Sequence, residues 1–330
     1  MQMDREEIKM EWEKASLREA LGKTLLEIGD KVPNMLLVNA DLAGSTQVTY
    51  FMEKYPERTV EVGIAEQNMI GVATGLAMMD YKPFVVTFAR FASKRASDQV
   101  SLCVDYCRTS VPIIGAYAGI FTGAQGATQQ MICDTAAMRS MPNMTVVDTA
   151  DVHEIRAVLH YAVEHKGPLY IRVGRDTWPV VFDESYSFEL GKGTWLREGS
   201  DVVLLNSGIL LHYAIEAAEM LQQEGIDAGV INMPTIKPID VDLLNDVARN
   251  VGAIVTLENH NVQGGFGSAV AEALINNYPV PVEFIGLQNV YTESAPNDDL
   301  AERYQLTAPW VAAAAKRALE RKNKYWTRRD

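Results

Sequence analysis

The segment from residue 60 to residue 79 has the greatest potential for chemistry in this sequence. A short apolar strand leads here into a helix that mixes Met, Ile, Val and Leu with Gly71, Ala73, Gly75 and Ala77. Small residues allow close packing, so we expect this helix to be buried on more than one side. Glu66 stands at its start between apolar neighbours. Taken alone, that carboxylate is explained by the helix dipole and the free N–H groups of the first turn.

Strands and helices alternate around this segment. Residues 35–39 (MLLVN) form a short apolar run of the kind found in parallel strands that are covered on both faces. Ser16, with Glu19 three residues later, predicts a capped helix start. The predicted strands are 35–39, 83–88, 111–116, 144–147 and 169–173, and the predicted helices are 16–28, 67–79, 94–106, 132–140 and 152–165. This order predicts a doubly wound parallel sheet with helices on both faces.

The alternation stops after Arg175 and resumes near residue 200. Residues 178–199 contain turn residues and no clear helical period, which indicates an interdomain connection. Strands are then predicted at 201–205, 228–232, 253–257 and 282–286, with helices at 209–224, 241–247, 267–276 and 308–322. The sequence therefore predicts an α/β fold with two doubly wound domains, at residues 1–185 and 200–330, and a linker at 186–199.

The composition is that of a globular protein, with 48% hydrophobic and 22% charged residues. The formal net charge of −13 argues against nucleic acid and anionic membrane surfaces as partners. No window reaches the roughly 18 apolar residues of a membrane span, and the charged segment 1–14 lacks the apolar core of a signal peptide. Cys103, Cys107 and Cys133 form neither a disulfide framework nor a zinc-site spacing. We therefore expect a cytoplasmic protein with no membrane partner.

Several short motifs occur in an order that resembles the pyrimidine-binding domain of the transketolase family, over about residues 15–180. They are Ala40-Asp41-Leu42 with Ser45-Thr46, Gly63-Ile64-Ala65-Glu66-Gln67-Asn68-Met69, Thr87-Phe88-Ala89-Arg90-Phe91, Arg95-Ala96-Ser97-Asp98-Gln99, Gly123 with Gly126-Ala127-Thr128-Gln129-Gln130, and Pro142-Asn143-Met144. Leu257-Glu258-Asn259-His260 and Gly264-Gly265-Phe266-Gly267 are similar to that family's C-terminal domain. Each motif alone is weak evidence for this family, but the whole series in this order is strong evidence. The sequence resembles the C-terminal subunit of a split transketolase.

This resemblance implies thiamine diphosphate as the cofactor. It makes Glu66 the carboxylate that bonds the aminopyrimidine ring, because a buried carboxyl group can share a proton with the ring and so drive its 4′-amino group to the imino form. Phe88 and Phe91 match the aromatic residues that hold the ring, and core packing is the alternative explanation for both. Asp41 and Gln99 complete the implied cofactor contacts. Gln129 is implied as a second catalytic residue.

The resemblance also implies a sugar-phosphate site. Arg18, Ser45 and Arg175 match the family's phosphate contacts, and two arginines with a hydroxyl suit a dianion because guanidinium groups donate paired hydrogen bonds. Tyr117, Gln125 and Gln129 occupy positions from which the family contacts the sugar. The implied reaction is the transfer of a two-carbon ketol unit between sugar phosphates.

The segment 116–134 departs from the common pattern of the family. Tyr117 and Gln129 replace histidines, Gln125 replaces an aspartate and Cys133 replaces a glutamate, although animal transketolases also have glutamine at the position of Gln129. Gln125 removes a charge and adds hydrogen-bond donors. We therefore expect a substrate other than the ordinary pentose phosphates: a different hydroxyl pattern, a branched sugar, or another anionic group such as a sulfonate.

The Gly-Asp-Gly motif with which the family holds Mg²⁺ and the diphosphate is not found; Gly29-Asp30 is followed by Lys31. The resemblance therefore implies that an N-terminal transketolase subunit provides the diphosphate-binding domain and holds the Mg²⁺ (or Ca²⁺), and it assigns no metal ligand to this chain. An α2β2 tetramer with sites between unlike chains is expected.

Three alternatives stay open. The β subunit of a 2-oxo acid dehydrogenase has the same layout, but Ala40-Asp41-Leu42 and Gly126-Ala127-Thr128 favour a transketolase. Deoxyxylulose-phosphate synthase is normally one longer chain. A non-catalytic subunit would explain the changes at Tyr117, Gln125 and Cys133. Against it, a scaffold has no use for a buried, unpaired carboxylate such as the one expected at Glu66.

Overall fold

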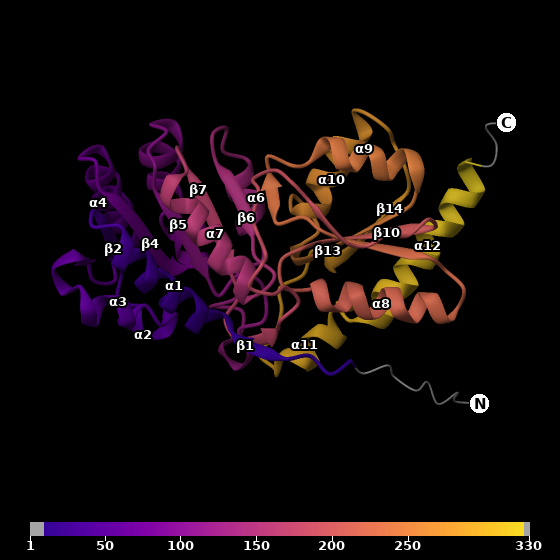
Figure 1. The fold of residues 1–330 in the computed structure, drawn as a ribbon, viewed down its shortest axis with the longest axis horizontal. Helices are drawn as coiled ribbons and strands as arrows, with labels where there is room; N and C mark the ends of the chain where they lie inside the picture. Colours follow the sequence, from indigo (N-terminus) through magenta and orange to yellow (C-terminus); the bar gives the residue numbers. More distant parts are fainter. Residues whose placement is uncertain (1–9, 327–330) are drawn as a thin grey trace.

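The computed structural model describes residues 10–326, so most of the predicted charged segment 1–14 lies outside the described residues. Figure 1 shows two α/β lobes side by side, the first in indigo to magenta and the second in orange and yellow. The predicted α/β class with two parallel-sheet domains is confirmed.

The first lobe is built on a seven-stranded sheet with the strand order β12-β6-β7-β5-β4-β2-β3. Its strands pair in parallel except for β12, which is antiparallel to β6. The strands are β2 (Met35–Asn39), β3 (Thr59–Glu61), β4 (Lys82–Phe88), β5 (Pro112–Ala116), β6 (Thr145–Asp148), β7 (Leu169–Val173) and β12 (Thr235–Lys237). Every residue of β2, β5, β6 and β7 is buried, as expected for strands covered on both faces.

Helices cover both faces of this sheet, and two of them begin at a capping side chain. Ser16 caps α1, because its hydroxyl accepts a hydrogen bond from the backbone N–H of Glu19 at 3.3 Å. Asp151 caps α7 in the same way. The α-helices are α1 (Leu17–Lys31), α2 (Ala43–Thr46), α3 (Thr49–Lys54), α4 (Glu66–Met78), α5 (Ser97–Gln99), α6 (Asp134–Arg139) and α7 (Val152–Glu164); η1 (Pro56–Arg58) and η4 (Gly123–Gln125) are 3₁₀-helices, and η2 (Phe91–Arg95) and η3 (Val100–Tyr106) are π-helices.

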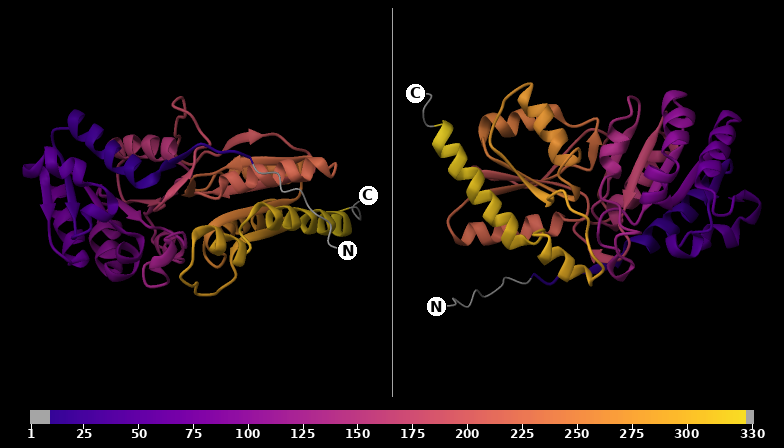
Figure 2. Two further views of the ribbon diagram at one scale, coloured as in Figure 1. Left: turned by 90° about the horizontal axis from the view of Figure 1, so that it is seen from below. Right: turned by 180° about the vertical axis from the view of Figure 1, so that it is seen from behind.

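The second lobe has a five-stranded sheet with the order β14-β13-β10-β11-β9. Its strands are β9 (Thr194–Arg197), β10 (Val202–Ser207), β11 (Ala228–Asn232), β13 (Ile254–Asn261) and β14 (Val282–Leu287), and its helices are α8 (Leu211–Gln223), α9 (Val241–Asn250), α10 (Phe266–Ile275), α11 (Asn297–Arg303) and α12 (Ala308–Trp326). Figure 2 shows α12 as a long yellow helix running along the outer side of this lobe. No helix among the described residues is both long and apolar enough to cross a membrane.

The structure differs from the sequence-based prediction in the short elements. The stretch 178–199, predicted as an irregular connection, contains β9 and most of β8 (Thr177–Pro179); β8 pairs with β1 (Lys14–Ser16), and β9 pairs with β11. Strand β12 lies beyond the predicted linker but joins the first sheet. The predicted helix 94–106 is divided among η2, α5 and η3. Strands of three or four residues carry too little periodicity to be predicted, since long-range pairing stabilises them.

The two lobes share a continuous buried core, in which side chains from α1 and α7 connect with those from α8 and α12.

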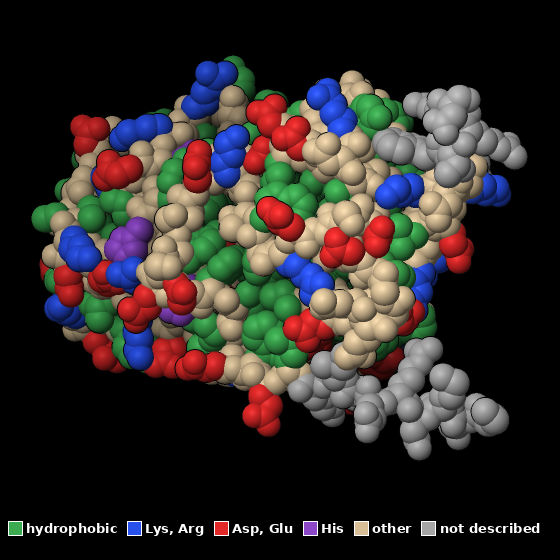
Figure 3. Space-filling model, turned by 45° about the vertical axis from the view of Figure 1, so that its right-hand side comes forward, with side chains coloured by type: hydrophobic (Ala, Val, Ile, Leu, Met, Phe, Trp, Pro, Cys, Tyr) green, Lys and Arg blue, Asp and Glu red, His purple; other side chains and the backbone are tan. Residues whose placement is uncertain are grey.

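Figure 3 shows one face of the molecule, on which basic and acidic side chains intermingle and no continuous basic area is visible.

Candidate active site

Glu66 is the first residue of α4, and its side chain is 2% exposed. Its Oε1 accepts a hydrogen bond from Nη1 of Arg95 at 2.6 Å. The sequence predicted that this carboxylate would be unpaired. That prediction is wrong, because Glu66 forms an ion pair with Arg95. The side chain of Arg95 is 47% exposed, so one partner of the pair faces solvent.

Three aromatic rings stack beside this carboxylate. The centroids of Phe88 and Phe91 lie 5.4 Å apart with an interplanar angle of 27°, and those of Phe88 and Tyr117 lie 4.0 Å apart at 23°. The guanidinium of Arg95 lies 4.0 Å from the ring centroid of Phe91, which is a cation–π distance. The strand ends of β4 and β5 and the start of η2 bring these rings together.

A cavity of about 600 Å³ opens next to Glu66 and the rings. Its walls come from the ends of β2 and β4, the turn before α4, η2 and the loop after β5; the lining residues are Ala40, Asp41, Leu42, Ser45, Ile64, Glu66, Phe88, Phe91, Arg95, Gln125 and Gln129. The carboxyl ends of parallel strands are where α/β sheets generally bind ligands. The structure thus brings together Asp41, Ser45, Glu66, Phe88, Phe91, Gln125 and Gln129 of the predicted set.

Arg18, Tyr117 and Arg175 form a second group beside Ser45. Nη1 of Arg18 donates to the backbone carbonyl of Ser45 at 2.9 Å and to the hydroxyl of Tyr117 at 3.2 Å, while its Nε donates to the carbonyl of Arg175 at 2.8 Å. Tyr117 is 1% exposed, and the guanidinium carbons of Arg18 and Arg175 lie 5.8 and 5.4 Å from its ring centroid. The tyrosine is thus packed between two cations and Phe88.

Two glutamines differ in their position relative to the cavity. Gln129 lines it, and its Oε1 is buried without a hydrogen-bond partner among the described residues. That oxygen is available as an acceptor for a bound ligand. Gln99 lies on α5 and does not line the cavity.

Sequence reasoning gave no role to two residues of the site. Arg95 stands in a motif that the sequence singled out, but its pairing with Glu66 depends on how η2 packs against α4. Ile64, 75% exposed at the cavity wall, offered no signal except its apolar character in a turn. No group of three or more His, Cys, Asp or Glu side chains that could hold a metal occurs in residues 10–326.

Exposed apolar side chains occur around α4 and on η3, with Ile64 at the cavity and Met78 and Met79 at the other end of α4. Ile64, Met78, Met79, Leu102 and Tyr106 are between 55% and 78% exposed. The outer face of α4 includes Gly71 and Gly75, and a Cβ at either glycine would meet nothing within 4 Å. The expectation that this helix is buried on more than one side is therefore wrong for the described residues of this chain. Exposed apolar surfaces of this kind mark interaction sites in soluble proteins.

These features define a class: a two-domain α/β protein with a ligand cavity at the carboxyl strand ends of its first sheet. Residues 13–180 match the family model described as "Transketolase, pyrimidine binding domain", and residues 191–311 match "Transketolase, C-terminal domain". The chain belongs to the transketolase family. The predicted resemblance is confirmed for both domains, and the family is one of transferase enzymes that use thiamine diphosphate.

Two relatives of similar length are described as transketolase subunits. The chain is 41% identical over 307 residues to the 6-deoxy-6-sulfo-D-fructose transketolase subunit SqwH of Clostridium sp. (strain MSTE9), covering 93% of this chain and 95% of the relative. It is 34% identical over 299 residues to a subunit of the apulose-4-phosphate transketolase of Phocaeicola vulgatus, covering 90% and 96%. A solved structure described as "Split gene transketolase, inactive beta4 tetramer" superposes with a TM-score of 0.87 at 46% identity and covers 93% of this chain and 99% of its own.

Proposed function

We propose that this chain is one subunit of a split transketolase that is active only with an N-terminal subunit carrying the diphosphate-binding domain and the Mg²⁺ site. The complex transfers a two-carbon ketol unit between sugars that bear an anionic group. The observation that carries the proposal is the buried carboxylate of Glu66 beside the stacked rings of Phe88 and Phe91, in a cavity formed by a pyrimidine-binding domain.

The residues present fit the pyrimidine part of thiamine diphosphate. A carboxylate can hold a proton at a ring nitrogen, and the flat faces of Phe88 and Phe91 offer a stacking surface for an aromatic ring. When bound, the cofactor supplies the carbon nucleophile that receives and passes on the ketol unit. Arg95 binds one carboxylate oxygen of Glu66, Oε1, so the bond to the ring can come from Oε2, or from Oε1 once Arg95 has moved away. The half-exposed Arg95 can turn toward solvent, whereas the buried Glu66 is fixed at the start of α4.

The exposed apolar surface of α4 and η3 supports a partner subunit at this site. It borders the cavity through Ile64, so a partner that covered it would also close the cavity and exclude water. Gly71 and Gly75 would let the partner's backbone approach α4 closely. We propose an α2β2 assembly, with each active site between unlike chains. The three cysteines are free, which fits the cytoplasmic location that we also propose.

The substrate we propose is a ketose other than xylulose 5-phosphate. Tyr117 is packed between Arg18, Arg175 and Phe88 and does not line the cavity, while neutral Gln125 and Gln129 do. Arg18 uses Nε and Nη1 on backbone carbonyls, which leaves fewer donors for a dianion. A sulfonate carries one negative charge, and the relative that shares 41% identity is described as a sulfofructose transketolase subunit. These points favour a sulfonated or branched ketose as donor.

The test is to produce the chain together with its partner subunit and to measure cofactor binding and ketol transfer. The donor panel contains 6-deoxy-6-sulfofructose, fructose 6-phosphate and xylulose 5-phosphate. Glu66→Gln should lower turnover by about 100-fold or more, as expected for loss of a proton-transfer group. Glu57→Gln is the matched control, because that side chain is 69% exposed on η1. Unchanged turnover in Glu66→Gln would refute the mechanism, and a complex that binds no cofactor would instead identify a non-catalytic subunit.

A further inference from the structure

The loop between β5 and α6, residues 117–133, carries all four positions at which this chain departs from the common pattern of its family: Tyr117, Gln125, Gln129 and Cys133. Two of them, Gln125 and Gln129, line the 600 Å³ cavity. Apart from the short η4, the loop has no regular structure. Its base is closed by paired backbone hydrogen bonds between Gly119 and Met131, at 2.8 and 2.9 Å. A loop of this kind needs further contacts to hold one conformation.

Asn259, at the end of β13 in the second lobe, holds the start of this loop. Its Oδ1 accepts a hydrogen bond from the backbone N–H of Ile120 at 3.0 Å, and its Nδ2 donates to the carbonyl of Ala118 at 3.4 Å. Asn259 is 3% exposed. Between these two contacts, Gly119 has φ +76°, and a Cβ there would collide with the side chain of Asn259. The fit between loop and asparagine therefore leaves no room for another residue type at position 119.

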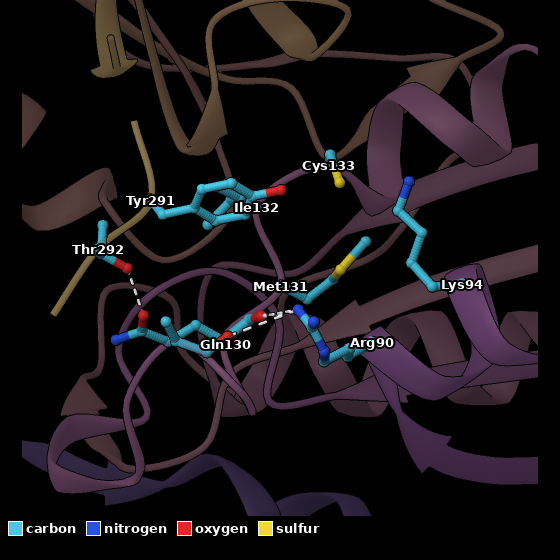
Figure 4. Close-up of a pocket in the computed structure, with 9 residues that line it drawn as sticks. Arg90, Lys94, Gln130, Met131, Ile132, Cys133, Tyr291 and Thr292 are labelled. Atoms are coloured by element: carbon cyan, nitrogen blue, oxygen red, sulfur yellow. Dashed lines mark hydrogen bonds between the residues drawn. The ribbon is translucent and has the colours of Figure 1, made fainter. Parts of the chain in front are cut away.

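A second contact comes from the segment that follows β14, at the other end of the loop. The hydroxyl of Thr292 donates to Oε1 of Gln130, and Nε2 of Gln130 donates to the carbonyls of Ile120 and Glu293, both at 3.1 Å. Gln130 is 2% exposed and Thr292 is 6% exposed. From the opposite side, Arg90 donates to the carbonyls of Ala127 and Gln130. Figure 4 shows Gln130 between Thr292 and Arg90 at the edge of a cavity of about 320 Å³.

The part of the second lobe that holds the loop is itself fixed. Nη2 of Arg172, on β7, donates to the backbone carbonyl of Asn259 at 3.0 Å, and Arg172 is bound by Asp134 and Asp148. The contact with Arg172 sets the position of β13 relative to the first sheet, so that Asn259 is a rigid support. The backbone N–H of Asn261 also donates to the carbonyl of Ile132, within the loop, at 2.9 Å.

We infer that the C-terminal domain determines substrate binding by positioning the 117–133 loop, with Asn259 and Thr292 as positioning residues. Neither side chain lines the 600 Å³ cavity. Asn259 contacts the loop backbone, and Thr292 contacts the side chain of Gln130. Through these contacts, both residues set the positions of Gln125 and Gln129. This inference rests on the proposed function for its link to the substrate. The residues assigned to the cofactor, Glu66, Phe88 and Phe91, lie outside the loop.

The experiment compares Thr292→Val, which removes the hydroxyl and keeps the shape, with Thr292→Ser, which keeps the hydroxyl. Both are assayed in the complete complex. For Thr292→Val we expect KM for the ketose to rise about five- to tenfold, which corresponds to one lost buried hydrogen bond, with cofactor affinity nearly unchanged. Thr292→Ser should restore the wild-type KM. An unchanged KM in the valine variant, or no rescue by serine, would overturn the inference.

Amide hydrogen exchange provides a readout that does not depend on activity. Thr292→Val should speed exchange of the loop amides, including those of Gly119, Ile120 and Met131, and leave α4 and β4 unchanged. Asn259→Asp is the second variant, because it keeps the acceptor for Ile120 and loses the donor to Ala118. If the wild-type complex transfers no ketol unit, the proposed function fails, and the positioning role is judged by exchange alone. Loop exchange that stays at the wild-type rate in both variants would then overturn it.

Discussion

Asp134 anchors the buried ion network between the two lobes, and Asp134→Ala should destabilise the protein strongly. Asp134 and Arg172 are 0% and 1% exposed, and the guanidinium binds both oxygens of the carboxylate, at 2.7 and 3.2 Å. The hydroxyl of Tyr170 donates to the same carboxylate at 2.9 Å. Burial pushes the pKa of Asp134 upward, but Arg172, His260 and the hydroxyl of Tyr170 together outweigh it and the pKa is lowered, so the ionised form is the native one.

The size of the effect follows from the geometry. Removing one partner of a buried ion pair costs about 3–5 kcal/mol, because the remaining charge stays desolvated. Asp148 still contacts Arg172, which places the expected loss near the lower end of that range. At about 2 °C per kcal/mol for a large domain, the melting temperature should fall by about 6–8 °C.

The assay is thermal unfolding followed by circular dichroism, with Glu272→Ala as the matched control. Arg139 of the first lobe and Glu272 of the second form an ion pair at 2.6 Å, but the glutamate is 65% exposed, whereas Asp134 and Arg172 are both buried. Such surface pairs contribute less than about 1 kcal/mol. If Asp134→Ala lowered the melting temperature no more than Glu272→Ala, the assignment of a stabilising role to the buried network would be refuted.

Three further predictions concern acid stability, assembly and specificity. Burial lowers the pKa of His212 from 6.5 to about 3, so its stabilising contribution is complete above pH 6.5 and is lost as the pH falls toward 3. As the pH is lowered from 6 to 4.5, the free energy of unfolding measured in urea should fall by up to about 1.4 kcal/mol more per pH unit in the wild type than in His212→Gln. Equal pH dependence of this free energy in the two proteins would contradict the prediction. Gly71→Arg should abolish co-purification with the partner subunit, although arginine suits a helix better than glycine does; Ile275→Arg, at a 69% exposed position of the second lobe, is the control and should still co-purify. The double substitution Tyr117→His with Gln125→Asp should increase ketol transfer from xylulose 5-phosphate, and no gain would count against the proposed link between these residues and substrate choice.

The sequence was sufficient for the parts of this protein that depend on local pattern. Wholly apolar runs such as Met35–Asn39 predicted the buried parallel strands, and Ser16 predicted the start of α1. The order of the short motifs along the chain was enough to recognise the family. That resemblance implied Glu66, Phe88 and Phe91 as site residues, and the structure places all three at one cavity.

Only the tertiary structure decided how the site is held. The pairing of Arg95 with Glu66, the packing of Tyr117 against Phe88 and near two arginines, and the support of the 117–133 loop by Asn259 and Thr292 join residues far apart in the chain. Their side chains show no local periodicity. Arg95 meets Glu66 only when η2 packs against α4, and Asn259 reaches the loop only when β13 is set against β7. Whether a carboxylate is free or paired depends on which groups share its buried space, and that is a property of packing between elements.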